Sequence, residues 1–463
     1  MTITTAEPAE SLFNTLGAKY EDAFADDPIL CSFIESVAKK LPAKSKVLDV
    51  GCGTGKPVSH LLASAGHDVY GIDVSTEMVR LAGSQVPGGV FQQADMRQYQ
   101  PPCEMDAVFA VLSLFQLTPG DLVSMMYKFA EWVRVDGFVA LCVLPSTALA
   151  PHRVVYDPTW DAAWMIGKEW MGSLTNESFL SEHGWERVLR EAGFVLEVEP
   201  VSYLFSPIGD NHIPEVHHCL IARRVEKIPL LGPFPWPSGG RVTGVCTTEG
   251  NILQEQRLVS PTLDKLTMGL GQLGVLTLEK DGKGTFGGLS ITSKGWSEVA
   301  EQVSLSDLLK EEAETVFAPW TLSDIAKVDE SLANVVRAAK SRIVLIQGAP
   351  DNEVVRLVNS VARSLPISHQ GQLLGSAREY LANNGFERTS LQHIQASFDF
   401  PEKELSERCN AAAEFLIGLW HHDHAQKKEM IEILGHRLQL LFKGHEHSIG
   451  FNMVALVATR RRN

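Results

Sequence analysis

A glycine-rich turn and a following acid are the residues whose types and spacing most clearly indicate chemistry. Residues 51–55 read Gly-Cys-Gly-Thr-Gly and directly follow the apolar run 46–50, which has the pattern of a buried strand. Glycine lets the backbone approach a ligand closely, because no Cβ stands in the way. A second strand-like run, 68–73, ends in Asp73, and a carboxylate at that point can accept hydrogen bonds from both hydroxyls of a ribose. The pattern therefore predicts a nucleotide-binding site.

The spacing of the glycines separates two classes of nucleotide cofactor. A dinucleotide fingerprint has the form G-x-G-x-x-G, and its third glycine would fall where this chain has Lys56. The chain instead has G-x-G-x-G, preceded by Asp49. This pattern resembles motif I of the class I S-adenosylmethionine-dependent methyltransferases. The resemblance covers roughly residues 10–225 and implies a Rossmann-like α/β fold, a seven-stranded sheet with helices on both faces, and S-adenosyl-L-methionine as cofactor.

The resemblance also implies which residues hold the cofactor. Family members bind its amino-acid end against the glycine loop and its ribose on the acid after the second strand. An acid followed by an apolar residue, here Asp95 and Met96, lies near the adenine, although Asp95 could instead only cap a loop. The strand 106–112 resembles the one that ends beside the sulfonium. On this basis the expected cofactor residues are Tyr20, Asp49, Gly51, Cys52, Gly53, Gly55, Asp73, Val74, Asp95, Met96, Ala110 and Leu112.

Tyr20 belongs to an expected N-terminal helix over residues 12–24. In the resembled family such a helix often covers the cofactor with an aromatic side chain, and Phe13, Tyr20 and Phe24 suit that role. The three aromatics could equally be core contacts of a docking helix.

Methyl transfer from a sulfonium requires an aligned nucleophile, exclusion of water, and a base when the nucleophile starts protonated. Histidine is the usual base near neutral pH, and His152 is the first candidate, with Tyr156 and His212 as further catalytic candidates. The connection 145–184 is rich in aromatic residues and would cover the substrate. Aromatics at 156, 160 and 164 have near-helical spacing, which fits a helix packed on the core equally well. The expected substrate-lining residues are Phe115, Arg153, Trp160, Trp164 and Tyr203, and Arg153 could hold a substrate carboxylate.

The chain is expected to divide into a methyltransferase domain (1–228), a proline- and glycine-rich linker (229–240) and a C-terminal α/β domain (241–463). Several segments of the second half echo the first in the same order, which suggests a diverged second copy rather than an unrelated α/β domain. The glycine-rich stretch 281–288 follows a strand-like run, but no ribose acid follows at the right distance. A β-hairpin is expected there, so the second domain is expected to be catalytically silent.

Five histidines and two acids form two short clusters in the second half. The histidines are His421, His422, His424, His445 and His447. Their spacing matches no metal motif, so a solvated polar face is preferred to a zinc or iron site, and no metal is assigned.

Charge and composition limit the partners. The formal net charge is −15, which disfavours nucleic acids and anionic membranes. No apolar run is long enough to span a bilayer, the N-terminus lacks the pattern of a secretory signal, and the seven cysteines are scattered. These features predict a cytoplasmic enzyme.

The expected substrate is a small aromatic or apolar metabolite, methylated on oxygen or nitrogen, in a role that would suit secondary metabolism. The alternative is a protein that binds the cofactor but catalyses a non-methylating reaction or serves a regulatory role. A monomer with an internal pseudo-dimer is expected, with a homodimer left open.

Overall fold

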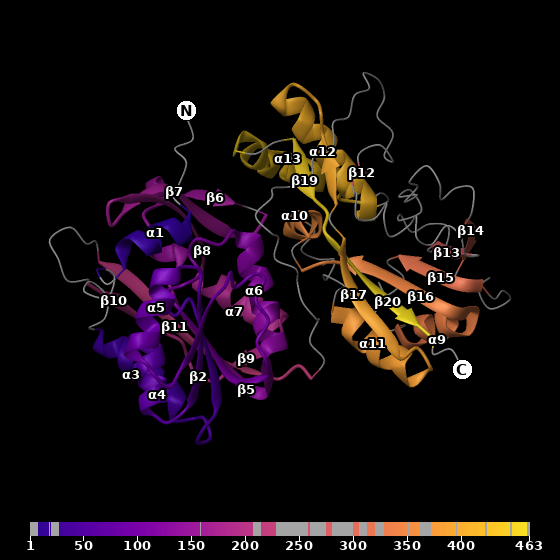
Figure 1. Ribbon diagram of the computed structural model, residues 1–463. Helices are drawn as coiled ribbons and strands as arrows, with labels where there is room; N and C mark the ends of the chain where they lie inside the picture. The colour runs from indigo at the N-terminus through magenta and orange to yellow at the C-terminus, as the bar shows by residue number, and fades with distance from the viewer. Residues whose placement is uncertain are drawn as a thin grey trace. The chain divides into compact units, whose positions relative to one another are not determined.

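The structure is a computed structural model. It describes residues 8–17, 19, 27–157, 159–206, 214–227, 258–259, 275–279, 300–304, 313–319, 328–350, 352–361, 372–394, 396–421, 424–444 and 447–460. The chain divides into two compact units (Figure 1). The first comprises residues 1–157 and 161–237, and the second comprises 158–160 and 238–463.

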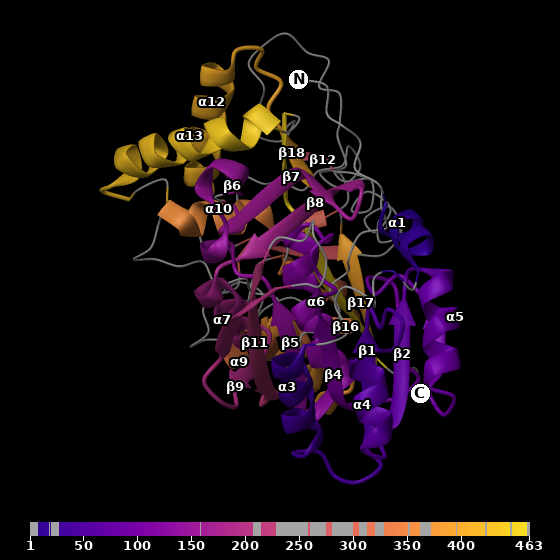
Figure 2. The same ribbon diagram turned by 90° about the vertical axis from the view of Figure 1, so that its left-hand side faces the viewer.

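A twisted sheet forms the centre of the first unit. Its strand order is β10-β11-β5-β4-β1-β2-β3, with β9 pairing to β11, and Figure 2 shows the strands from β11 to β2 in this sequence. The strands β1 to β5 run parallel and β11 runs antiparallel to β5. The bounds are β1 Lys46–Val50, β2 Asp68–Asp73, β3 Val90–Gln93, β4 Met105–Val111, β5 Val133–Val143, β9 Phe194–Leu196, β10 Val201–Phe205 and β11 Glu215–Arg224. Since β1 lies between β2 and β4, the order reverses at β1, and ligands bind beyond the carboxyl ends of strands at such a point.

Helices cover both faces of this sheet, with α3 and α4 on one side and α6 and α7 on the other (Figure 1). They are α1 Ala9–Leu16, α3 Pro28–Ala38, α4 Val58–Ser64, α5 Thr76–Gln85, α6 Pro119–Trp132 and α7 Glu182–Glu191. The starts of α3 and α6 follow from local sequence. Asp27 and Thr118 accept hydrogen bonds from the first-turn N–H groups, and proline occupies the first helical position in both. The α/β architecture expected for this part of the chain is therefore present.

The connection after β5 forms a small antiparallel sheet of β6 Val155–Asp157, β7 Ala162–Trp170 and β8 Ser173–Leu180. Two short 3-10 turns, η1 Ser146–Ala148 and η2 Pro151–Arg153, precede it. The helical interpretation of the aromatic spacing is wrong, because Tyr156 and Trp164 lie on paired strands. The backbone N–H of Ser178 donates to the carbonyl of Phe115 at 2.9 Å, and its hydroxyl donates to the carbonyl of Leu117. These bonds fasten β8 to the loop after β4.

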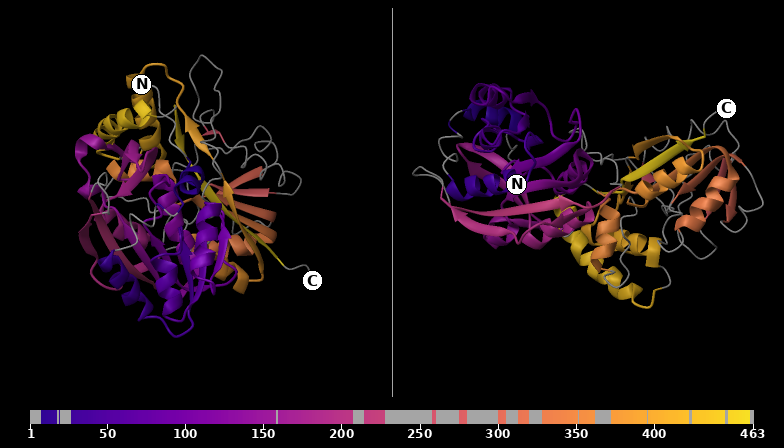
Figure 3. Two further views of the ribbon diagram at one scale, coloured as in Figure 1. Left: turned by 60° about the vertical axis from the view of Figure 1, so that its left-hand side comes forward. Right: turned by 90° about the horizontal axis from the view of Figure 1, so that it is seen from below.

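The second unit contains a six-stranded sheet with the order β14-β13-β15-β16-β20-β17. The strands β13 to β16 run parallel, whereas β20 is antiparallel to both β16 and β17. Figure 3 shows β20, in yellow, among the orange strands and helices of this unit. The bounds are β13 Val275–Glu279, β14 Ala300–Ser304, β15 Ala313–Pro319, β16 Ala339–Gly348, β17 Arg388–Ile394 and β20 Met453–Thr459. The strand β13 has parallel neighbours on both sides, β14 and β15. The glycine-rich stretch 281–288, where a β-hairpin is expected, lies outside the described residues.

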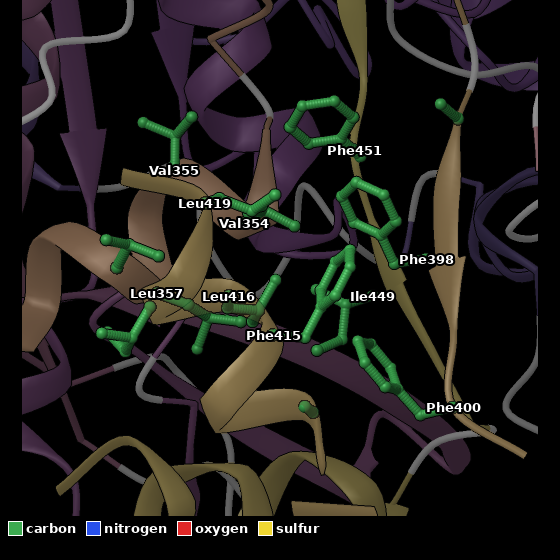
Figure 4. Packing of buried hydrophobic residues seen from close by; sticks show 14 of the residues in the cluster. Val354, Val355, Leu357, Phe398, Phe400, Phe415, Leu416, Leu419, Ile449 and Phe451 are labelled. Atoms are coloured by element: carbon green, nitrogen blue, oxygen red, sulfur yellow. The ribbon is translucent and has the colours of Figure 1, made fainter. Parts of the chain in front are cut away.

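Helices and a second small sheet complete this unit. The helices are α9 Val328–Ala338, α10 Glu353–Val361, α11 Gln372–Asn383, α12 Leu405–His421 and α13 Lys427–Gly444, and the small sheet joins β12 Leu258–Val259, β18 Ser397–Asp399 and β19 Ser448–Gly450. An aromatic core fixes the small sheet against α10 and α12 (Figure 4). The ring centroid of Phe398 lies 4.9 Å from that of Phe415 and 4.8 Å from that of Phe451. None of the described helices combines the length and the apolar composition that a membrane-spanning helix needs.

Candidate functional site

The glycine loop after β1 adopts a conformation that requires glycine. Gly51 has φ +72°, and a Cβ at this position would lie 2.4 Å from the Cβ of Ser113. The N–H groups of Gly51 and Cys52 both donate to the carbonyl of Ile72, at 2.8 and 2.9 Å. The turn is thus held against the end of β2, while the end of β4 approaches from the other side.

Asp73 ends β2 and fastens the loop to it. One carboxylate oxygen accepts from the N–H of Gly53 at 3.0 Å, and the other accepts from the N–H of Ser75 at 2.8 Å. The side chain is 8% exposed, and burial raises the pKa of Asp73 although these backbone hydrogen bonds lower it. Each carboxylate oxygen has a further lone pair, so Asp73 can still accept two hydroxyl donors.

A cavity of about 450 Å³ opens beside this loop. Its walls come from the carboxyl ends of β1, β2 and β4, from α1, and from β7, β8 and the start of β11. The side chains that line it change from polar near Asp73 to aromatic and charged on the small sheet. The lining residues include Phe13, Gly51, Gly53, Asp73, Val74, Asp95, Met96, Leu112, Ser113, Phe115, Gln116, Lys168, Trp170, Asn176, Glu177 and Glu215. Its volume is in the usual range for a small-molecule site.

The helix α1 is fastened over the edge of this cavity. The Asn14 side-chain oxygen accepts from the Ser75 hydroxyl at 2.7 Å and from the N–H of Glu77 at 3.2 Å. The preceding residue, Phe13, lines the cavity and meets Trp170 edge-on, with 6.0 Å between ring centroids. The expected covering role for Phe13 therefore agrees with its position, whereas Tyr20 and Phe24 lie outside the described residues.

Comparison with known proteins gives the family. A family model described as a methyltransferase domain matches residues 47–137. Trans-aconitate 2-methyltransferase of Escherichia coli O157:H7 is 30% identical over 192 residues, which are 41% of this chain and 68% of the relative. The chain belongs to the class I S-adenosylmethionine-dependent methyltransferases.

Two further proteins are similar to parts of this chain. A dTDP-3-amino-3,4,6-trideoxy-alpha-D-glucopyranose N,N-dimethyltransferase of Streptomyces venezuelae is 30% identical over 107 residues, which are 23% of this chain and 45% of the relative. The chain thus spans less than half the length of that relative. A solved S-adenosylmethionine-dependent methyltransferase from Mesorhizobium loti is 18% identical, covers 41% of this chain and 96% of its own, and has a TM-score of 0.32.

S-adenosylmethionine is the cofactor of this family, and the site has the chemistry to hold it. Gly51 and Gly53 leave room beside the loop, and the Asp73 carboxylate, which lines the same cavity, suits the two hydroxyls of a ribose. When bound, this cofactor supplies a methyl group that is attached to a positively charged sulfur. The sulfur is the leaving group and becomes part of a neutral thioether. The glycine loop and Asp73 therefore fit S-adenosylmethionine.

The expected cofactor residues fall into two sets. Those that line the cavity are Gly51, Gly53, Asp73, Val74, Asp95, Met96 and Leu112. Those that lie beneath or behind its wall are Asp49, Cys52, Gly55 and Ala110. Gly55, at φ +88°, packs against α5, where a Cβ would lie 3.1 Å from the Cα of Ala82. Burial raises the pKa of the Cys52 thiol.

Asp49 supports the loop from below instead of lining the cavity. It is 1% exposed and accepts a hydrogen bond from the Ser59 hydroxyl at 2.7 Å. Burial raises the pKa of Asp49 to about 7, and the hydrogen bond from Ser59 opposes that rise. Asp49 is thus partly protonated near neutral pH and joins β1 to α4.

Asp95 lines the cavity but is already held by a neighbour. Arg97 Nη2 lies 2.7 Å from one carboxylate oxygen, and Arg97 Nε lies 3.0 Å from the other. Burial raises the pKa of Asp95, but the hydrogen bonds from Arg97 outweigh this and lower it overall. The carboxylate stays ionised, and its orientation is set by the arginine.

The expected catalytic residues do not meet in the cavity. His152 and Arg153 lie exposed on η2, and Tyr156 is 51% exposed with its hydroxyl donating to Asp161 at 2.7 Å. The residue His212 lies outside the described residues. These assignments assumed that the first residues after β5 turn inward, whereas the structure brings β7 and β8 to the cavity.

Three of the expected substrate-lining residues lie elsewhere too. Trp160 is buried, and Trp164 donates through Nε1 to Asp157 at 3.2 Å. The Tyr203 hydroxyl donates to Asp27 at 2.6 Å and lies 3.1 Å from His217 Nδ1. None of the three lines the cavity, whereas Phe115 does.

Sequence reasoning missed the polar cavity residues of β7, β8 and β11. Lys168, Asn176, Glu177 and Glu215 line the cavity from three different strands. A β-bulge between Met165 and Lys168 shifts the register of β7 against β8 and changes which side chains face inward. Gly167, between Ile166 and Lys168, was the local signal of that bulge.

The histidine clusters are only partly described. The rings of His421 and His424 meet edge-on, with centroids 5.9 Å apart, and burial lowers the pKa of His421. Within the described residues, no group of three or more histidine, cysteine or acidic side chains is placed to hold a metal ion.

Proposed function

We propose that this chain is an S-adenosylmethionine-dependent methyltransferase that methylates an oxygen or nitrogen of a small aromatic or apolar metabolite. One observation carries the proposal: a single cavity joins the Gly51 loop and Asp73 to an aromatic wall of Phe13, Phe115 and Trp170. The matched relatives are named for a sugar amine and for trans-aconitate, which supports a small acceptor and leaves both atom types open.

The protein's part in this reaction is positioning and exclusion of water. Asp73 and the glycine loop hold the nucleotide end, and α1 covers it through the bonds of Asn14. The loop after β4, from Leu112 to Phe115, stands between the two ends of the cavity and is fixed by the bond from Ser178. An apolar acceptor would be held against Phe115 and Trp170 with its nucleophilic atom toward that loop.

Partners and location follow the same proposal. We propose that the protein acts on a small molecule in the cytoplasm, where its scattered cysteines would stay reduced. Its net charge of −15 disfavours a nucleic acid or an anionic membrane as a partner. A role in secondary metabolism and a monomeric state belong to the proposal too.

Two measurements test the function. The protein is incubated with a metabolite extract and donor carrying an isotopically labelled methyl group, and mass spectrometry should find label in small molecules. In parallel, calorimetry should show binding of S-adenosylhomocysteine. Binding without any labelled product would favour the alternative of a non-methylating or regulatory protein, and absence of binding would overturn the proposal.

A further inference from the structure

The charged side chains of the cavity wall already have partners. Lys168 Nζ lies 2.9 Å from a carboxylate oxygen of Glu177 and 3.4 Å from one of Glu215. Arg97, which lines the cavity too, lies 2.7 Å from a carboxylate oxygen of Asp95. A ligand group that binds one of these ions therefore competes with an existing ion pair.

Two uncharged carboxamides line the same cavity and keep N–H groups that no described residue accepts. The Gln116 side chain makes no hydrogen bond within the described part of the chain. Asn176 uses its side-chain oxygen to accept from the N–H of Gly167 at 2.9 Å, so its NH2 group is left over. Since a carboxamide NH2 carries two donors, the pair can donate to a ligand without breaking a contact within the protein.

Both carboxamides are held at one junction between β8 and the loop after β4. Gln116 lies between Phe115 and Leu117, whose carbonyls accept from the N–H and the hydroxyl of Ser178. Asn176 precedes Ser178 by two residues, and the two share a face of β8 because side chains alternate along a strand. The junction thus positions both carboxamides before any ligand binds.

An aromatic wall stands beside this junction. The ring of Phe115 lines the cavity, and its centroid lies 6.0 Å from that of the buried Phe179. Trp170 lines the cavity as well. Because Gln116 follows Phe115 in the chain, a flat ligand packed on this ring lies next to a carboxamide.

The unused N–H groups penalise a ligand that cannot accept from them. Gln116 and Asn176 are each partly exposed, so water can accept from them in the free protein. A hydrocarbon that displaces this water leaves the N–H groups unpaired, whereas an oxygen atom of the ligand takes the place of the water. A site of this kind discriminates against the analogue that lacks the oxygen.

We propose that the acceptor carries an uncharged oxygen, such as that of a carbonyl group, on its aromatic or apolar body, and that Gln116 and Asn176 donate to this oxygen. This inference rests on the proposed function and names a group that its acceptor carries. The two carboxamides determine specificity, and the aromatic wall of Phe115 and Trp170 holds the rest of the molecule.

The test compares two probes of the same shape, acetophenone and α-methylstyrene, which differ by a carbonyl oxygen in place of a methylene group. Both are uncharged, so the ion pairs of the wall do not separate them. Their affinities for the full chain are measured by ligand-observed NMR with saturating S-adenosylhomocysteine and without it. The wild type should bind acetophenone about three- to tenfold more tightly, the range expected for a neutral hydrogen bond. Equal affinities, or tighter binding of α-methylstyrene, would overturn the inference without using any variant.

Variants then assign the preference to the carboxamides. Gln116→Met has a similar length and no N–H donor, and it should lower the preference by about threefold. Asn176→Asp keeps an oxygen for the N–H of Gly167 and should lower it by a similar factor, while the double variant should abolish it. An unchanged preference in the double variant would remove the assignment.

Two controls exclude a merely structural effect. Gln116→Met should bind α-methylstyrene as tightly as the wild type, which would show that the aromatic wall is intact. Gln92→Met makes the same change at an exposed position on β3 outside the cavity wall, and it should leave both affinities unchanged. An equal loss of preference in Gln92→Met and Gln116→Met would contradict the assignment.

The readouts separate this inference from the proposed function. Binding of S-adenosylhomocysteine with labelled products but without a preference for acetophenone would remove the oxygen assignment and leave the methyltransferase. Absence of S-adenosylhomocysteine binding would overturn the proposed function, and the probe affinities of the ligand-free protein would still decide the preference for the carbonyl oxygen.

Discussion

The central sheets of the two units share a strand order and direction. The first reads β10-β11-β5-β4-β1-β2 and the second reads β17-β20-β16-β15-β13-β14, with parallel and antiparallel pairs in the same places. In both, the antiparallel strand beside β5 or β16 is the last strand of its unit. The strand pattern is what a duplicated unit predicts, and descent from a duplication stays a prediction.

The difference lies at the ends of the strands. In the first unit Val50 pairs with Ile72, and Asp73 follows. In the second unit β14 ends in Ser304 and the next residue in the chain is Leu305, so neither position carries a carboxylate. The two sheets have the same topology, so the topology alone does not make a cofactor site. A few residues at the ends of the strands decide whether a cofactor can bind.

The largest expected effect is on the ribose acid. Asp73→Asn should weaken S-adenosylhomocysteine binding by about 2–4 kcal/mol, because hydrogen bonds to a charged acceptor are lost. Calorimetry measures the effect, and Asp68→Asn, at the exposed start of the same strand, is the control. An unchanged affinity in Asp73→Asn would remove the site assignment.

Stoichiometry separates the two units directly. The wild type should bind one S-adenosylhomocysteine per chain, since neither Ser304, which ends β14, nor Leu305, which follows it, carries a carboxylate. A value of two in the calorimetric titration would contradict the contrast between the units.

Asp49 should make stability depend on pH. Its folded pKa of about 7 lies above the ordinary value of 3.8. Between these values the folded protein binds a proton that the unfolded chain does not, so this contribution to stability is present below pH 4 and is lost as the pH rises to 7. As the pH rises from 4 to 7, the wild type should lose about 2–4 kcal/mol of unfolding free energy relative to Asp49→Asn, because the asparagine does not titrate. Denaturant melts at several pH values measure it, and a pH-independent difference would show that Asp49 is ionised throughout.

A pair of glycine substitutions contrasts the units further. Gly51→Ala should destabilise by about 1–3 kcal/mol, because the new Cβ meets Ser113 and the φ is positive. Gly418→Ala, in α12 with open space around it, should stabilise by about 0.5–1 kcal/mol. Thermal melts compare them, and a neutral or stabilising effect of Gly51→Ala would show that the loop tolerates a side chain.

The sequence predicted the residues on the cofactor side of the cavity. It did not predict those on the side formed by β7, β8 and β11. Gly51, Gly53 and Asp73 were found because a turn and the two strands around it are close in sequence and have fixed spacing. Lys168, Glu177 and Glu215 come together only through a bulge and the pairing of strands far apart in the chain. No local pattern encodes that meeting. The aromatic spacing of Tyr156 to Trp164 misled for a related reason. Tyr156 lies on β6, Trp164 on β7 and Trp160 on the connection between them, so no single element carries the period.

Ser75 has a consequence for how ligands come and go. Its N–H donates to Asp73 and its hydroxyl donates to Asn14, so one residue links the ribose acid to α1. Under the proposed function, displacing α1 breaks a hydrogen bond next to the carboxylate that binds the ribose. Cofactor exchange and weakening of the ribose contact then occur together. Release of S-adenosylhomocysteine then depends on the hydrogen bond between Ser75 and Asn14. The variant Asn14→Ala should shorten the residence time of S-adenosylhomocysteine by a few-fold, as measured by stopped-flow displacement.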